Sequence, residues 1–212
     1  MWDCDGVLVD TERLVTRLEA EWITALGWPL TQGEVVDRFV GRTATHMDAE
    51  IERHLGRAVP TGWHGDLREA SHKLFRTELT AIDGVVDVLD RLDRAAVMSC
   101  VASSSDHDRL RLVLGMTDLY DRFGGRVHSA FDVPRGKPAP DLFQHAAELA
   151  GVAVGGGDCV VVEDSVPGVT GAVAAGMRVL GYAGGLVPAA QLIEAGAEVF
   201  EHMREVPARL DV

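Results

Sequence analysis

Two patterns of hydrophobic and polar positions alternate along most of the chain. Continuous apolar runs rich in β-branched residues, VMSCVAS (97–103) and CVVVED (159–164), each end in a polar cluster. Such runs are typical of strands buried on both faces of a parallel sheet. Between them, DRLRLVLG (108–115) and PDLFQHAAELAG (140–151) carry apolar residues at helical spacing. The alternation predicts an α/β fold, a Rossmann-like parallel sheet with right-handed crossovers.

Residues that start and stop helices support the predicted helix at 140–151. The helix predicted from 140 starts at Pro140 and stops at Gly151, which are good start and stop signals. A further short strand is predicted at RVLGY, residues 178–182.

Residues 11–80 follow a different pattern, with helical periodicity and no convincing strand. Gly27 ends the first periodic stretch, and TQGE (31–34) fits a capping box. We therefore predict an all-helical inserted domain at 11–80 and an α/β core domain made of 1–10 and 81–212. The apolar stripes expected to form the core of this helical domain are Leu14, Leu18, Trp22 and Leu26; Met47, Ile51 and Leu55; and Trp63, Leu67, Ala70 and Leu74.

The first strand is the weakest element of this pattern. Only Met1 and Trp2 precede Asp3, whereas a central strand usually has about five residues. The sequence leaves two interpretations open: the strand is short, or the sequence lacks a few residues upstream of Met1.

Composition and charge narrow the function classes. The 212 residues are 47% hydrophobic and 25% charged, with a net charge of −13. That acidity argues against a general binder of nucleic acids or acidic membranes, and no apolar run is long enough to span a bilayer. Three separated cysteines without a CxxC motif are expected to be buried, reduced thiols. We expect a cytoplasmic protein, a monomer or weak homodimer, that binds a small molecule.

Polar side chains gather where the predicted strands end. Ligands of an open parallel sheet bind at the carboxyl ends of the strands, so these clusters are expected to meet in one crevice. They are Asp3-Cys4-Asp5-Gly6, Ser103-Ser104-Ser105 and Glu163-Asp164-Ser165, with RGKPAPD, which contains Lys137, before a helix.

This inventory suits phosphate chemistry. Several carboxylates favour a hard divalent cation, and Mg²⁺ is the usual choice when phosphate is also bound. A lysine and a strand-end hydroxyl can hold the remaining phosphate oxygens. One aspartate can attack phosphorus and form an aspartyl-phosphate, and a second aspartate two residues later can act as general acid and base. An EF-hand is excluded for the first cluster, because the twelfth position is Leu14 and glycine falls at the fourth.

Four segments together resemble the haloacid dehalogenase-like (HAD) hydrolase superfamily. They are DCDGVLVDT, VASSS, GKPAPDLF and VVVEDSVPGVTGAVAAGM, in the order found in that family. The helical insert resembles the α-helical cap of the branch that contains β-phosphoglucomutase and many sugar-phosphate phosphatases. The resemblance implies a HAD fold with a cap that closes over the core and contacts the substrate.

The resemblance also implies roles for individual residues. Asp3 is then the nucleophile and a magnesium ligand, and Asp5 is the general acid and base and offers its backbone carbonyl to the metal. Ser103 holds the phosphoryl group, and Lys137 neutralises the nucleophile and the phosphate.

Further candidates complete the predicted site. Glu163 and Asp164 finish the metal site, directly or with one of them acting through water. In the cap, Arg42 of the GRT segment is a candidate phosphate or sugar contact, with a simple helix end as the alternative. Ser104 is a candidate for substrate binding, whereas Ser105 is expected to cap the next helix, with Asp106 as its competitor.

Other polar residues receive structural roles. Asp10 is expected to start the following helix or to stabilise the loop before it. Ser165 and Gly168 are expected to shape the turn after the metal acids. The eight histidines show no HxH or HExxH spacing, so zinc is not expected and they are assigned to solvated faces.

Within the superfamily, the residues favour a phosphatase. Dehalogenation is disfavoured because that reaction does not require an acid two residues after the nucleophile, where this chain has Asp5. Phosphonate hydrolysis is disfavoured because it needs a cap lysine that forms a Schiff base, and Lys73, the only lysine of the cap, is a poor candidate. β-Phosphoglucomutase is the main alternative, but its hinge histidine is replaced by Val15. We therefore expect a Mg²⁺-dependent phosphoric monoester hydrolase acting on a small phosphorylated metabolite, a sugar or sugar-acid phosphate. A non-enzymatic phospho-metabolite-binding protein of the same fold is the second alternative.

Overall fold

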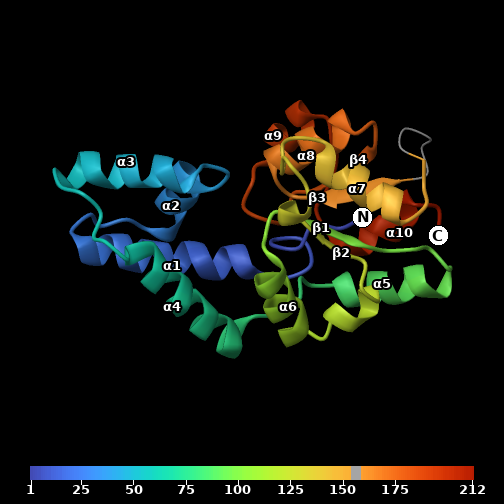
Figure 1. Ribbon diagram of the computed structural model, residues 1–212, viewed down its shortest axis with the longest axis horizontal. Coiled ribbons are helices and arrows are strands. Elements are labelled where there is room, and N and C mark those ends of the chain that lie inside the picture. The colour runs from blue at the N-terminus through green and yellow to red at the C-terminus, as the bar shows by residue number, and fades with distance from the viewer. Residues whose placement is uncertain (154–158) are drawn as a thin grey trace. The chain divides into compact units, whose positions relative to one another are not determined.

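The computed structural model describes residues 1–153 and 159–212 (Figure 1). The chain forms two compact units, one made of Met1–Asp10 with Thr80–Val212 and the other of Thr11–Leu79. We refer to them as the core unit and the helical unit. That the helical unit serves as a cap stays a prediction.

The core unit contains a parallel sheet whose two parts are joined by the start of the chain. Strands β1 (Val101–Ser103) and β2 (Val127–Ser129) pair in parallel, as do β3 (Val160–Glu163), β4 (Arg178–Tyr182) and β5 (Glu198–Phe200). Trp2 forms parallel bridges to Val101 of β1 and to Val162 of β3. The resulting order is β2-β1-Trp2-β3-β4-β5, and the predicted α/β fold with a parallel sheet is confirmed.

Two strands are shorter than the apolar runs predict. The run at 97–103 forms a strand only over Val101–Ser103, and the run at 159–164 only over Val160–Glu163. The first run is paired over a short length because its neighbour β2 has three residues. At its start, the Val97 N–H instead donates to the Leu92 carbonyl and closes the preceding helix.

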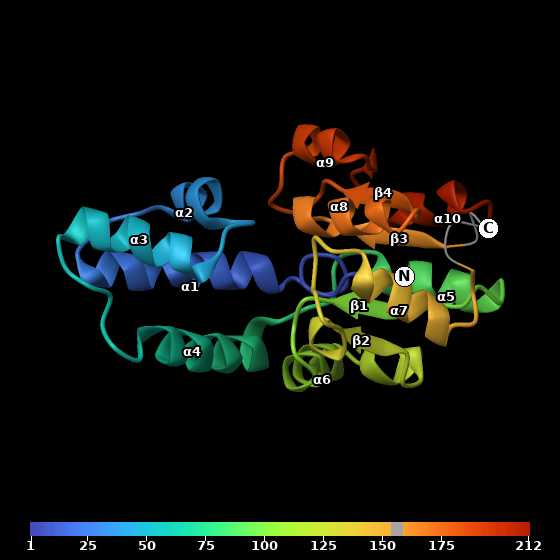
Figure 2. The ribbon, with the colours of Figure 1, turned by 45° about the horizontal axis from the view of Figure 1, so that its top comes forward.

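Helices follow the strands, as the α/β pattern predicts (Figure 2). Fully buried side chains such as Phe143, Val161 and Val169 form one apolar cluster between sheet and helices. Burying a side chain of this size stabilises the fold by about 1.5–3 kcal/mol. The helices are α5 (Val85–Arg94), α6 (His107–Met116), α7 (Asp141–Leu149), α8 (Val166–Ala174), α9 (Ala189–Ala195) and α10 (Val206–Arg209), with short 3₁₀ turns η1 (Tyr120–Phe123), η2 (Ala130–Asp132) and η3 (Met203–Glu205).

The helical unit consists of α1 (Thr11–Leu26), α2 (Gln32–Phe39), α3 (Ala44–Leu55) and α4 (Trp63–Glu78). Its own core contains Ile23, Val35, Ile51 and Trp63, all buried. The unit therefore has an apolar interior independent of the sheet.

Local signals at two helix ends act as predicted. Gly27 follows α1 with φ +114°, a conformation that side chains other than glycine rarely adopt. The capping box at α2 is present: the Thr31 side chain accepts from the Glu34 N–H, and the Glu34 carboxylate accepts from the Thr31 N–H.

The stripe predicted for α4 is partly wrong. Ala70 and Leu74 are only half-buried, and the buried face carries Ser71 and Phe75 in their place. Ser71 can be buried because its hydroxyl donates to the Leu67 carbonyl at 2.9 Å within the helix.

Among the described residues, no helix has both the length and the apolar character needed to cross a membrane.

Glu19 of α1 makes the stability of the helical unit sensitive to pH. Burial raises the pKa of its carboxyl from about 4.5 to about 7. Between these two values the folded chain keeps a proton that the unfolded chain releases, so stability falls as pH rises through this window. We expect Glu19→Gln to raise the free energy of unfolding by about 1–2 kcal/mol at pH 8 and by less at pH 5, because glutamine carries no charge to desolvate.

Urea unfolding followed by circular dichroism at both pH values measures this effect. Glu21→Gln, at an exposed position of the same helix, is the control and should change stability little at either pH. A gain that is the same at pH 5 and pH 8, or equal gains in the two variants, would contradict the assignment.

Candidate active site

A buried lysine connects two carboxylates at the carboxyl edge of the sheet. The Lys137 ammonium donates to Asp3 Oδ1 at 2.6 Å and to Glu163 Oε1 at 2.5 Å. The side chain of Lys137 is 3% exposed and that of Glu163 is fully buried. Segments 134 and 26 residues away from Lys137 in sequence therefore meet at one charged group.

The sheet places these three side chains. The Asp3 N–H donates to the Val162 carbonyl at 2.9 Å, which aligns the start of the chain beside β3. Glu163 is the last residue of β3, and Lys137 comes from the loop before α7. Because all strands are parallel, their carboxyl ends lie at one edge, and the predicted convergence of Asp3, Lys137 and Glu163 is observed.

The cluster contains more carboxyl groups than positively charged groups. Burial raises the pKa of Asp3 to about 7, although the Lys137 charge acts in the opposite direction. Burial alone would lower the pKa of Lys137, but the charges of Asp3 and Glu163 outweigh it and raise that pKa, so the ammonium stays protonated. Asp164, which is 1% exposed, adds a third buried carboxyl group.

These carboxyl groups fit a divalent cation. One oxygen from each of Asp3, Glu163 and Asp164 lies within 4.8 Å of the others. Three carboxylates against one ammonium leave a negative surplus in a desolvated place, and oxygen donors are what Mg²⁺ prefers. The residues present therefore fit the magnesium site that the resemblance implies.

Glu163 is held by the first turn of α8. Its Oε2 accepts from the Asp164 N–H, the Ser165 N–H and the Ser165 hydroxyl, at 3.0, 3.0 and 2.8 Å. The Ser165 hydroxyl in turn accepts from the Gly168 N–H and caps the helix. A Cβ at Gly168 would lie 1.8 Å from Glu163 Oε1, so only glycine leaves room for this carboxylate. The predicted shaping of the turn by Ser165 and Gly168 is observed.

Asp5 has a separate set of partners. Arg109 donates to Asp5 Oδ1 at 2.7 Å, and the Ser105 hydroxyl donates to Asp5 Oδ2 at 2.8 Å. Burial alone would lower the pKa of Arg109, but the charge and hydrogen bond of Asp5 outweigh it and raise that pKa. Arg109 is therefore a permanent cation that holds the Asp5 carboxyl group in place.

The sequence pattern did not indicate Arg109. An available signal was its place in the first turn of α6, four residues after Ser105, from which its side chain reaches back to Asp5. The expectation that Ser105 caps this helix is wrong: Asp106 caps it, and its carboxylate accepts from the Arg109 N–H at 2.8 Å. The Ser105 hydroxyl is engaged by Asp5 instead, because the serine precedes the cap position.

The remaining predicted site residues differ in their burial. Ser103 ends β1, is 1% exposed, and its hydroxyl accepts from the Ser105 N–H at 3.1 Å. Ser104 is exposed. Arg42 lies exposed between α2 and α3 of the helical unit, and its N–H donates to the Phe39 carbonyl at 3.0 Å. The substrate contacts assigned to Ser104 and Arg42 stay predictions.

Two expectations about other residue types need correction. Histidines were assigned to solvated faces, but His128 is buried in β2 because its strand is covered by neighbouring elements. Cys4 and Cys100 are buried as expected, whereas Cys159 is only half-buried because it precedes β3 instead of lying within the strand.

Known proteins are similar to this chain in sequence and in fold. The family model "haloacid dehalogenase-like hydrolase" matches residues 1–176. A 6-phosphogluconate phosphatase of Escherichia coli K12 is 31% identical over 179 residues, which are 84% of this chain and 79% of that protein. A haloacid dehalogenase-like protein of Agrobacterium tumefaciens superposes with a TM-score of 0.90 at 34% identity, covering 99% of this chain and 96% of that one.

A HAD family hydrolase of Deinococcus radiodurans, solved with bound phosphate and sodium, has a TM-score of 0.86 at 30% identity and covers 99% of this chain and 93% of that one. The chain therefore belongs to the haloacid dehalogenase-like hydrolases. It is an enzyme of the hydrolase class, and the fold predicted from its motifs is confirmed.

Gly168→Ala tests the packing of the carboxylate cluster. The added Cβ would displace Glu163, which we expect to lower the free energy of unfolding by about 2–3 kcal/mol, in the range of overpacked cores. Gly115→Ala in α6 is the matched control, because nothing lies within 4 Å of its added Cβ. It should be neutral or stabilise by up to about 1 kcal/mol. Thermal unfolding of both variants measures the difference, and similar stabilities would contradict the close approach of Glu163.

Proposed function

We propose that this hydrolase is a Mg²⁺-dependent phosphatase that acts on a small phosphorylated metabolite, a sugar or sugar-acid phosphate. The observation that carries the proposal is a pair of aspartates with different partners. Asp3 lies in the carboxylate cluster and accepts a hydrogen bond from Lys137, whereas Asp5, two residues later, accepts one from Arg109. Such a pair supplies one nucleophile and one general acid and base.

In the first step, an Asp3 carboxylate oxygen attacks phosphorus. The bond from phosphorus to the ester oxygen breaks, and Asp5 gives its proton to that oxygen, which leaves as an alcohol. Asp3 now carries the phosphoryl group as an acyl phosphate. Lys137, fixed at 2.6 Å from Asp3, balances the charge that accumulates on Asp3 and the phosphate oxygens.

In the second step, Asp5 takes a proton from a water molecule, and the oxygen of that water attacks phosphorus. The bond to Asp3 breaks, and inorganic phosphate leaves. Ser103, at the end of β1, is assigned to hold the phosphoryl oxygens. Magnesium held by Asp3, Asp164, Glu163 and the Asp5 carbonyl would supply positive charge that the phosphoryl group needs.

The comparisons support the substrate class. The Escherichia coli relative is named for 6-phosphogluconate, a phosphorylated sugar acid. Arg42 of the helical unit is assigned to bind the phosphate or the sugar part of the substrate. The cytoplasmic location and the monomeric or weakly dimeric state stay predictions.

Phosphate release tests the proposal. The protein is incubated with a panel of phosphorylated sugars and sugar acids, with Mg²⁺ and with EDTA, alongside an Asp3→Asn variant. We expect release from one or a few compounds, its loss with EDTA, and loss of at least about 10³-fold in kcat for Asp3→Asn, since the nucleophile is removed.

Other outcomes would decide against the proposal. Conversion of β-glucose 1-phosphate to glucose 6-phosphate without release would make the protein a mutase despite Val15. No turnover of any compound, together with phosphate-ester binding, would favour the non-enzymatic alternative. Full activity of a correctly folded Asp3→Asn variant would refute the assigned nucleophile.

Arg109 is a positioning residue for Asp5 in this mechanism. We expect Arg109→Ala to lower kcat about 10- to 100-fold with little change in KM, because a misplaced acid and base loses much of its contribution. Arg109→Lys should recover part of the activity, since it restores one donor and the charge. Arg111→Ala, at an exposed position two residues later on the same helix, should leave kcat unchanged. Equal kcat values for the two alanine variants would contradict a positioning role of Arg109.

A further inference from the structure

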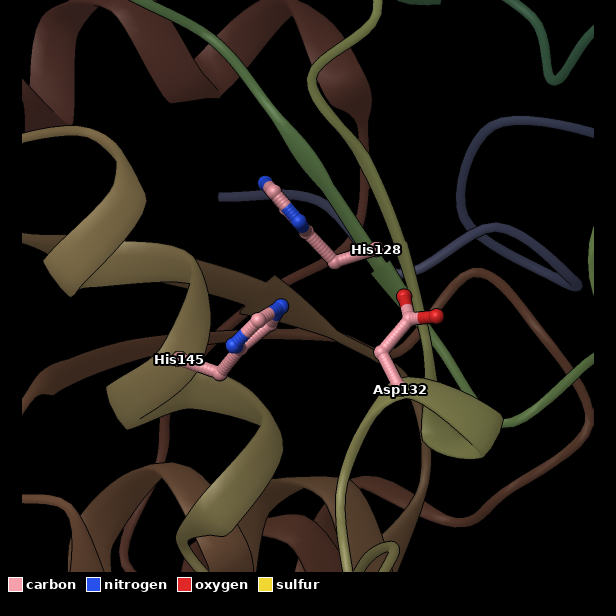
Figure 3. Close-up of side chains that lie close together, drawn as sticks. All are labelled: His128, Asp132 and His145. Atoms are coloured by element: carbon pink, nitrogen blue, oxygen red, sulfur yellow. The ribbon is translucent and has the colours of Figure 1, made fainter.

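Three potential metal ligands meet at the side of the core unit formed by β2, η2 and α7. His128 comes from β2, Asp132 from η2 and His145 from α7 (Figure 3). One ligand atom of each lies within 4.8 Å of the other two. The two imidazole rings meet edge to face, with 5.5 Å between their centroids. None of the three belongs to the carboxylate cluster of Asp3, Glu163 and Asp164.

The donor set differs in chemistry from that cluster. Two imidazole nitrogens and one carboxylate oxygen suit zinc and neighbouring transition metals, whereas Mg²⁺ prefers oxygen alone. Tetrahedral ligands about 2.1 Å from one ion lie roughly 3.4 Å apart, so small side-chain rotations would close the set around a metal. Three protein ligands leave the fourth position to water or to a small ligand.

The carboxylate of this set is already oriented by other groups. Asp132 Oδ2 accepts from the Ser129 N–H at 2.8 Å, and Asp132 Oδ1 lies 2.8 Å from His107 Nε2. Partners of this kind fix a ligand before the metal arrives. The Asp132 side chain is 28% exposed and His145 is half-buried, so a hydrated ion can reach the cluster.

We propose that His128, Asp132 and His145 form a second metal site that binds a divalent transition metal, for which Zn²⁺ is the probe. The spacing of these residues does not match a familiar motif, which is why the sequence analysis did not expect zinc. Strand, turn and helix bring together residues that lie up to 17 positions apart in the chain.

The site lies close to the hydrogen bonds that hold Asp5. The Ser129 hydroxyl donates to the Ser105 carbonyl at 2.7 Å, and the Ser105 hydroxyl donates to Asp5. Asp132, through the Ser129 N–H, is therefore connected to the group assigned as acid and base. The binding proposal does not depend on the phosphatase assignment, because its test measures metal and not turnover.

Isothermal titration with Zn²⁺ tests the proposal on the full chain, freed of metal by EDTA and dialysed into a buffer with excess Mg²⁺. His145→Gln removes one ligand from a half-buried position, and His128→Asn removes the buried one. His46→Gln, an exposed histidine of the helical unit, is the matched control. Circular dichroism confirms the fold of each variant before titration.

We expect one Zn²⁺ equivalent in the wild type and in His46→Gln that binds at least about ten-fold more weakly in His145→Gln. The visible absorption of Co²⁺ gives a second readout, since two imidazole ligands should produce a spectrum that His145→Gln abolishes. Should His128→Asn fail to fold, His145→Gln decides the matter alone. Identical Zn²⁺ titrations and Co²⁺ spectra for the wild type and a folded His145→Gln would overturn the proposal.

Discussion

The buried contact of Lys137 with Asp3 and Glu163 is the interaction on which the carboxylate cluster depends. It joins the first residues of the chain, the loop before α7 and the end of β3 at one point. Removing one partner of such a buried ion pair typically costs about 3–5 kcal/mol, because the remaining charges stay desolvated and uncompensated. The contact therefore fixes the geometry of the site and also constrains the fold around it. Its excess of carboxylates over cations is the electrostatic condition that favours a metal ion.

The two aspartates of the first motif differ because the fold gives them different neighbours. Asp3 lies among other carboxylates, and burial raises its pKa to about 7 even with the Lys137 ammonium beside it. Asp5 has a permanent cation in Arg109 and a hydroxyl donor in Ser105, and both hold its carboxylate in one orientation. Two chemically identical side chains, two residues apart, thereby lie in different electrostatic environments. The same principle, in which environment divides roles between like groups, applies to carboxylate pairs in general.

Glycine and serine residues at the start of α8 determine how the Glu163 carboxylate is placed. Gly168 permits the Glu163 carboxylate to lie against the first turn of α8, and Ser165 both donates to that carboxylate and caps the helix. A strand end, a carboxylate of the buried cluster and a helix start are thus combined within six residues. The helical unit has an apolar core of its own, separate from that of the sheet.

The sequence by itself determined the features that depend on local order along the chain. These include the parallel α/β pattern, the capping box at Thr31, the helix end at Gly27, the strand-end positions of Asp3 and Glu163 and the place of Lys137 before a helix. Strand ends and helix starts are marked by adjacent residues. Only the tertiary structure revealed that Arg109 holds Asp5, that Asp106 and not Ser105 caps α6, and that His128, Asp132 and His145 meet. Each of these depends on side chains that come together across separate elements, or on a shift of one residue in register. Hydrophobic periodicity does not record such distances, so the pattern predicted the convergence of Asp3, Lys137 and Glu163 but not the groups that hold Asp5.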